Sequence, residues 1–147
     1  MGTQNLALRA AAGAGVVLAV LAGAAPAQAA DQRSTIRTTV SCSAGFTGSA
    51  ELRLERAGSS VWATVTSYKM SSNGRSKGNV NVRIVVPGGP SSVSSNSADA
   101  MRQDGAWHAL GLTRGYDTSS RAYAEVEFVY DKKLADDPRC FASSVHF

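Results

Sequence analysis

The sequence contains few of the residues that most often carry catalysis or metal binding. Among its 147 residues there are only two histidines and two cysteines. A hydrolase needs a nucleophile, a base and an orienting group brought together, and His108 and His146 stand in no recognisable catalytic motif. Two histidines also make a poor zinc site. The sequence therefore predicts a protein that is not an enzyme and has no metal or cofactor. A small secreted hydrolase using one of the histidines is kept as an alternative.

Long apolar runs are equally scarce, and the only one lies near the N-terminus. Residues 10–25 are all apolar or small, and Pro26 ends the run just before two alanines at the spacing that a signal peptidase requires. The run has 16 residues, whereas a membrane-spanning helix needs about 20. We therefore predict a cleaved signal peptide at residues 1–29 and a secreted, extracellular domain at residues 30–147, with no membrane span after cleavage.

Charge of one sign is not concentrated anywhere in the chain. The formal net charge is +4, and loss of Arg9 with the signal peptide leaves 14 basic and 11 acidic residues, or +3. The densest basic cluster holds only Arg75, Lys77 and Arg83. Nucleic-acid-binding modules usually gather such residues into one patch, so no nucleic-acid partner is predicted. A weak positive charge still favours encounters with anionic polymers at a cell surface.

The two cysteines, Cys42 and Cys140, lack the close C-x-x-C spacing of a redox pair. An even number of cysteines in an exported protein indicates a disulfide bond, and two cysteines allow only one pairing. A bridge closing a loop of about 100 residues contributes about 4–5 kcal/mol by loop-entropy reasoning. We therefore predict a structural disulfide between Cys42 and Cys140, near the two ends of the domain.

No helical periodicity is visible after the signal peptide. Instead, short runs of alternating apolar and polar residues are separated by glycine, serine, asparagine and proline, which is typical of antiparallel β-sandwiches. We predict a single all-β sandwich of about seven strands. The predicted strands cover residues 36–42, 50–55, 61–70, 79–86, 107–112, 122–130 and 140–147.

Residues 87–96, with the sequence PGGPSSVSSN, interrupt these strands. Serine and glycine in this proportion favour flexibility, so we expect a mobile surface loop, followed by a short helical turn capped by Ser97. Residues 87–101 also suggest an alternative function, because an exposed loop can enter the cleft of a protease. Tight inhibitor loops are preorganised, and this composition does not favour that property.

Residues 74–78 match the G-x-S-x-G pattern of α/β-hydrolases. That chemistry needs a sharp turn from a strand into a helix. Here the pattern stands in a polar loop between two predicted strands, so its glycines are expected to serve turn geometry.

The strand at residues 61–70 presents the main candidate binding site. Strict alternation places Trp62, Thr64, Thr66 and Tyr68 on one face, opposite Val61 and its neighbours. If the valine face is buried, the other face is an exposed aromatic strip able to stack on sugar rings; if the tryptophan face is buried, Trp62 belongs to the core. The leading hypothesis is a secreted, non-enzymatic binding module for a cell-surface, polysaccharide or protein partner, of unspecified oligomeric state.

Overall fold

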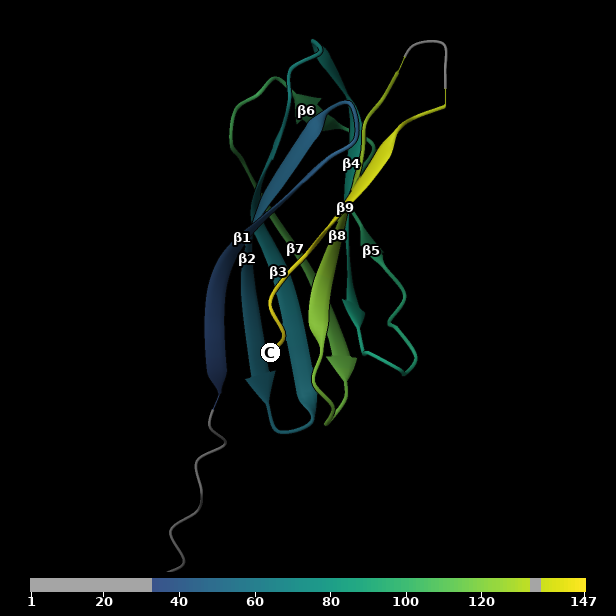
Figure 1. Cartoon of the computed structure of the whole chain (residues 1–147). Coiled ribbons are helices and arrows are strands. Elements are labelled where there is room, and N and C mark those ends of the chain that lie inside the picture. The colour runs from purple at the N-terminus through teal and green to yellow at the C-terminus, as the bar shows by residue number, and fades with distance from the viewer. Residues whose placement is uncertain (1–32, 133–135) are drawn as a thin grey trace, which may run out of the picture.

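The computed structural model describes residues 33–132 and 136–147, which form nine β-strands and no helix. The predicted signal peptide at residues 1–29 lies outside these described residues. All strand pairs are antiparallel, and they make two sheets (Figure 1). The predicted all-β sandwich is confirmed. The strands are β1 (Ser34–Ser43), β2 (Thr47–Ala57), β3 (Ser60–Met70), β4 (Arg75–Val85), β5 (Ser95–Asn96), β6 (Met101–Gln103), β7 (His108–Asp117), β8 (Tyr123–Val129) and β9 (Arg139–Ser143).

The first sheet has the strand order β1-β2-β3-β7, and the second has the order β5-β4-β8-β9 with β6 also paired to β4. The two sheets pack face to face, because β1 contacts β9 and both β3 and β7 contact β4. The seven strands predicted from alternation correspond to β1–β4 and β7–β9. Within residues 33–132 and 136–147, no helix has the length and apolar character that crossing a bilayer requires.

The hydrophobic core lies between the sheets, where the alternating patterns place it. Every second residue along β2, β4 and β8 is almost completely buried, while the residues between them face outward. Burial of this kind is the dominant stabilising contribution in a small domain. The buried side chains that follow this alternation are Ala50, Leu52, Leu54, Val80, Val82, Ile84, Ala124, Val126 and Phe128, and Val129 at the end of β8 is also buried.

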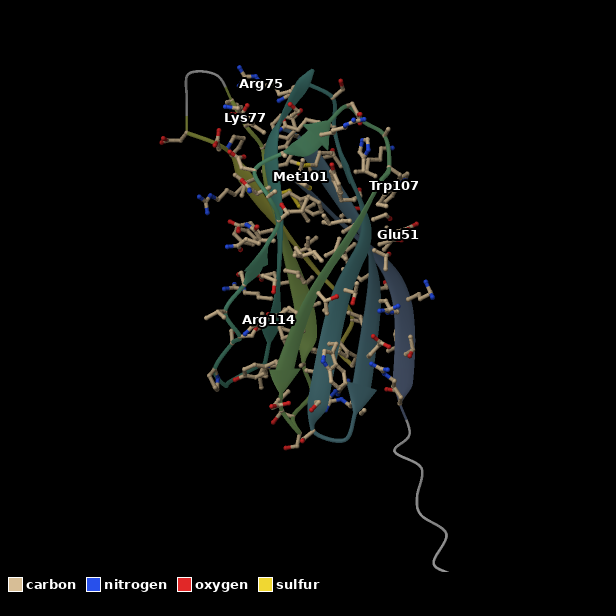
Figure 2. The ribbon with its side chains drawn as sticks, turned by 180° about the vertical axis from the view of Figure 1, so that it is seen from behind. Glu51, Arg75, Lys77, Met101, Trp107 and Arg114 are labelled. Atoms are coloured by element: carbon tan, nitrogen blue, oxygen red, sulfur yellow. A yellow bond between two sulfur atoms is a disulfide. The ribbon has the colours of Figure 1, made fainter. Side chains whose placement is uncertain are left out.

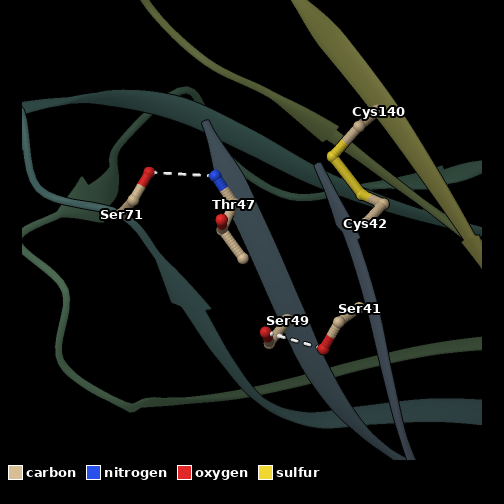
Figure 3. The surroundings of a disulfide bond; sticks show 6 residues. All are labelled: Ser41, Cys42, Thr47, Ser49, Ser71 and Cys140. Carbon is tan, nitrogen blue, oxygen red and sulfur yellow. Dashed lines mark hydrogen bonds between the residues drawn. A yellow bond between two sulfur atoms is a disulfide. The ribbon is translucent and has the colours of Figure 1, made fainter. Parts of the chain in front are cut away.

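A disulfide bond joins the two sheets. Cys42 of β1 is bonded to Cys140 of β9, with their Cα atoms 5.8 Å apart and a sequence separation of 98 (Figure 3). The predicted pairing is therefore confirmed. Nearby, the hydroxyls of Ser41 and Ser49 are 2.9 Å apart and hydrogen-bonded across β1 and β2 (Figure 3). A disulfide is compatible with an oxidising extracellular compartment.

The segment after β4 is docked along the edge of β4, rather than projecting as the loop expected from its composition. The backbone N–H of Ser92 donates to the carbonyl of Ile84, and its hydroxyl accepts from the N–H of Ile84 at 2.8 Å. Ser97 makes the same two contacts with Val80 instead of capping a helix. Serine hydroxyls thus replace backbone acceptors and satisfy the exposed edge of β4.

Candidate functional site

The strand expected to carry the binding strip contains a β-bulge. Val65 of β3 lies opposite Leu52 of β2, and Ser67 lies opposite Glu51, so Thr66 has no opposite residue. A bulge adds one residue to one strand, and it therefore moves the side chains that follow it to the other face of the sheet. The alternation that places Tyr68 beside Trp62 is interrupted at this point.

Tyr68 consequently lies in the core with 3% of its surface exposed. Its hydroxyl accepts a hydrogen bond from the backbone N–H of Arg102 at 2.8 Å. The prediction that strict alternation places Trp62, Thr64, Thr66 and Tyr68 on one face is therefore wrong, and of the two alternatives for β3 it is the face of Val61 that is buried. A binding role for any one of them separately stays a prediction.

Trp62 lies on the outer face of the first sheet, where its ring is already covered. A Cβ added at Gly115 of β7 would lie 2.9 Å from Cδ1 of Trp62, so the indole packs closely on the β7 backbone. Arg33 stands over the ring with Cζ 5.3 Å from its centroid, which is a cation–π contact. Glu55, opposite Trp62 in the sheet, is ion-paired with Arg33 at 3.3 Å and with Arg53 at 3.2 Å.

We call these five residues (Arg33, Arg53, Glu55, Trp62 and Gly115) the Trp62 end of the outer face. Beside them, Thr64 is 95% buried and its hydroxyl is hydrogen-bonded to that of Thr113 at 2.9 Å. Most side chains at this end therefore contact one another, although Nε of Arg53 is ion-paired without making a hydrogen bond among the described residues.

The other tryptophan, Trp107, differs from Trp62 in being open to solvent. It immediately precedes β7 and has 46% of its surface exposed. Glu51 lies close by in sheet register, because it is opposite Ser67, which in turn is opposite Ala109 of β7. Figure 2 shows Trp107 and Glu51 on the same side of the molecule.

A tight turn fixes the backbone that carries Trp107. Oδ1 of Asp104 accepts a hydrogen bond from the N–H of Ala106 at 2.9 Å, and Nε2 of His108 lies 2.8 Å from the same oxygen. The His108 ring also packs on Tyr68, with the ring centroids 5.4 Å apart. The hydrogen bond with His108, followed by that from Ala106, holds the pKa of Asp104 below its ordinary value.

The bulge opens a shallow depression in the outer face, which we call the bulge hollow. Its walls are polar and its floor includes the edge of the core. The lining residues are Arg37, Thr38, Thr39, Glu51, Leu52 and Thr66. Together with Trp107, the bulge hollow forms what we call the Trp107 end of the outer face.

Basic groups are available at the Trp107 end. Among residues 33–132 and 136–147, neither Arg37 nor Lys69 forms an ion pair, whereas both arginines of the Trp62 end do. Arg37 and Lys69 are both exposed. The two ends of one sheet face therefore differ in how many of their polar groups remain free to bind.

The histidines do not assemble a hydrolytic site in the described parts of the chain. His108 has a carboxylate partner in Asp104, but no serine is hydrogen-bonded to it there. His146 packs on Tyr123, with ring centroids 5.4 Å apart. The geometry that a serine hydrolase requires is not met by these contacts.

The G-x-S-x-G pattern also lies in a setting unlike a nucleophile elbow. Gly74 occupies the turn before β4, and Ser76 and Gly78 belong to β4 itself. Close by, Arg75 is ion-paired with Asp131 at 2.8 Å. No group of three or more potential metal ligands occurs among the described residues.

The sequence-based candidate strip includes Trp62, whereas the more exposed tryptophan in the structure is Trp107. The signal for Trp107 was the adjacent Asp-Gly turn at residues 104–105, which presents the side chain that follows it. The bulge hollow had no such signal, because the composition of β3 is that of a regular strand. No protein-family model, curated protein or solved structure matches this chain.

Proposed function

We propose that this protein is an exported, non-enzymatic module that binds an extracellular polysaccharide through the Trp107 end of its outer face. The observation that carries the proposal is the exposed indole of Trp107, held on a turn whose backbone is fixed by Asp104 and His108. Aromatic faces supply large apolar contact area at low entropic cost. A fixed turn reduces the ordering cost of binding further.

Two features support an extracellular setting for this activity. The N-terminal residues 1–29 have the pattern of a cleaved signal peptide. The Cys42–Cys140 bridge suits an oxidising compartment. A weakly basic domain is attracted to anionic cell-surface polymers, and the basic groups Arg37 and Lys69 favour that encounter.

Co-sedimentation of the domain, residues 30–147, with insoluble polysaccharides tests the proposal. Trp107→Ala is compared with Phe141→Ala, because Phe141 is similarly exposed, at 53%, but lies on β9 of the other sheet. We expect the Trp107 variant to bind at least about tenfold more weakly, in line with the loss of an interface aromatic. Phe141→Ala should stay within about twofold of wild type. Equal effects of the two substitutions, or no binding by wild type, would contradict the proposal.

The segment after β4 supports a second candidate, a secreted protease inhibitor. Val93 is 72% exposed, while Ser92 before it is anchored to Ile84 and Pro90 accepts a hydrogen bond from Tyr116 at 3.3 Å. An exposed apolar residue on an anchored segment is preorganised for a protease cleft. A panel of secreted serine proteases tests this, and only inhibition that Val93→Asp abolishes would favour it over polysaccharide binding.

A further inference from the structure

Irregularities in two neighbouring strand pairs coincide at Thr66, which lines the bulge hollow. Between β3 and β7, Val65 is opposite Leu112 and Ser67 is opposite Ala109, so Thr66 faces two residues of β7 instead of one. One of these two, Gly111, has a φ of 76°, a backbone conformation that residues other than glycine rarely adopt. Bulges often occur where a side chain must be re-aimed at a functional site.

The carboxylate of Glu51 in the bulge hollow is held in place through one of its two oxygens. Oε2 of Glu51 accepts a hydrogen bond from the hydroxyl of Ser67 at 2.6 Å. The hydroxyl of Thr66 donates to the backbone carbonyl of Glu51 at 3.1 Å and so fixes the main chain beneath it. Among the contacts of the described residues, Oε1 of Glu51 has no hydrogen-bond partner, so it remains available as an acceptor.

The donor in the hollow comes from the adjacent edge strand. Thr39 of β1 lies directly opposite Glu51, and Arg37 lies two residues away on the same face. Both Arg37 and Glu51 line the hollow, yet they form no ion pair within the described ranges. The hollow therefore presents a guanidinium donor, a carboxylate acceptor and the hydroxyls of Thr39 and Thr66 side by side.

We propose that the bulge hollow is a subsite for one pyranose unit that carries two adjacent free hydroxyls. One hydroxyl donates to Oε1 of Glu51, and the other accepts from the guanidinium of Arg37; both are charge-assisted hydrogen bonds. The mixed charge argues against other small ligands, because Glu51 repels anions and Arg37 repels metal ions. This assignment rests on the proposed function, whose polysaccharide it describes more closely.

The position of the hollow relative to Trp107 fits a chain rather than a single sugar. Glu51 lies two strands from β7, and Trp107 is two residues along from Ala109, the residue in line with Glu51. With strands about 4.8 Å apart and residues about 3.3 Å apart, the separation is roughly 12 Å. One polysaccharide chain can therefore place one unit in the hollow and a later unit against the indole.

Calorimetric titration with defined hexasaccharides tests the subsite. The probes are β-1,4-linked cellohexaose, mannohexaose and galactohexaose, whose internal units have adjacent free hydroxyls at C2 and C3, and chitohexaose, whose internal units have none because an acetamido group replaces the hydroxyl at C2. We expect wild type to bind at least one diol-bearing probe, and to bind chitohexaose at least about tenfold more weakly. Glu51→Gln and Arg37→Gln should each weaken the binding of that diol-bearing probe at least about tenfold, as expected when one partner of a charge-assisted contact is lost.

The matched control is Glu55→Gln, which changes the same residue type on the same strand and face but at the Trp62 end. It should bind within about twofold of wild type, and thermal unfolding should show all three variants folded. If Trp107→Ala weakens binding while Glu51→Gln and Arg37→Gln do not, the subsite is wrong and the proposed function stands. Equal binding of chitohexaose also overturns the subsite, and no binding of any probe by wild type overturns both.

Discussion

The two tryptophans of this chain sit at opposite ends of one sheet face and have opposite surroundings. Trp62 lies on Gly115, is covered by Arg33 and faces a carboxylate that is already ion-paired. Trp107 is 46% exposed and stands near a hollow with an unpaired guanidinium among the described residues. The Trp62 end is thus largely covered by its own neighbours, whereas the Trp107 end leaves an indole and the Arg37 guanidinium exposed.

The difference shows that exposure of an aromatic ring is decided by its neighbours rather than by its own strand position. Both tryptophans belong to a β-strand or directly precede one, but among the described residues only Trp62 packs closely on a glycine of the adjacent strand. The bulge at Thr66 lies between the two ends and breaks the regular surface. A small sheet can therefore combine a closed half and an open half on one face.

Removing the disulfide bond should have the largest effect on stability, and this effect should be greatest at the Trp107 end, where the bond lies. Cys42 is opposite Gly48, which is opposite Met70, and the Met70 carbonyl accepts the N–H of Gly105 in the turn before Trp107. Replacing both cysteines by alanine should lower the free energy of unfolding by about 4 kcal/mol, since the closed loop is long. Denaturant unfolding measures this loss.

Amide hydrogen exchange of the same double variant shows which part of the domain loses stability. Protection should fall more at residues 104–108 than at residues 60–64, because the bridge fastens only one end of the sandwich. Wild type under identical conditions is the control. A uniform loss of protection along β3 and β7 would show that the bridge acts on the whole domain and not on the Trp107 end.

Truncating each tryptophan in turn should separate stability from binding. Trp62→Ala should lower the free energy of unfolding by about 2 kcal/mol, which is less than for a fully buried tryptophan because the ring is only half-buried. Trp107→Ala should change it by no more than about 0.5 kcal/mol, as is usual for exposed side chains. Urea unfolding followed by circular dichroism measures both. Equal destabilisation would remove the distinction between the two ends.

The regular strands were predictable from sequence, whereas the bulge in β3 that shapes the site was not. Alternation in β2, β4 and β8 places the core residues correctly, because burial alternates without interruption over residues 48–54, 78–84 and 124–128. In β3 the same rule fails after Thr66, since nothing in its composition distinguishes a bulge from a continuous strand. A bulge is set by the pairing of two neighbouring strands, and a rule applied to one strand does not contain that information.

The segment after β4 is a second case in which the sequence pattern alone was insufficient, and here the pattern is amino-acid composition. Its serines predict flexibility when they are counted as small polar residues. In the fold, Ser92 and Ser97 act as hydrogen-bond acceptors for the edge of β4. Their role depends on an edge strand that lies beside them, which single-sequence patterns do not reveal. The disulfide, in contrast, was predictable because two cysteines allow only one pairing.

Substituting Gly115 by alanine should open the Trp62 end. The added Cβ would lie 2.9 Å from Cδ1 of Trp62 and 3.0 Å from Nε1, so the ring must move off β7. The destabilisation should be about 1 kcal/mol, since close overlap is relieved by displacing one side chain and alanine reduces the entropy of the unfolded chain. Tryptophan emission in the Trp107→Phe background, which reports Trp62 alone, should shift to longer wavelength. An unchanged emission maximum would mean that the ring does not rest on Gly115.

The smallest expected effect concerns acid pH at the turn that presents Trp107. The hydrogen bond with His108 lowers the pKa of Asp104 in the folded state, so ionised Asp104 stabilises the turn above about pH 4. That contribution is lost as the pH falls through the lowered folded value, because the protonated carboxyl binds His108 less well. Carbon-detected NMR of the Asp104 carboxyl should show a midpoint below the ordinary aspartate value, and His108→Gln should raise it. A midpoint that His108→Gln leaves in place would show that the imidazole does not hold the turn, and Trp107 would then owe its position to the backbone alone.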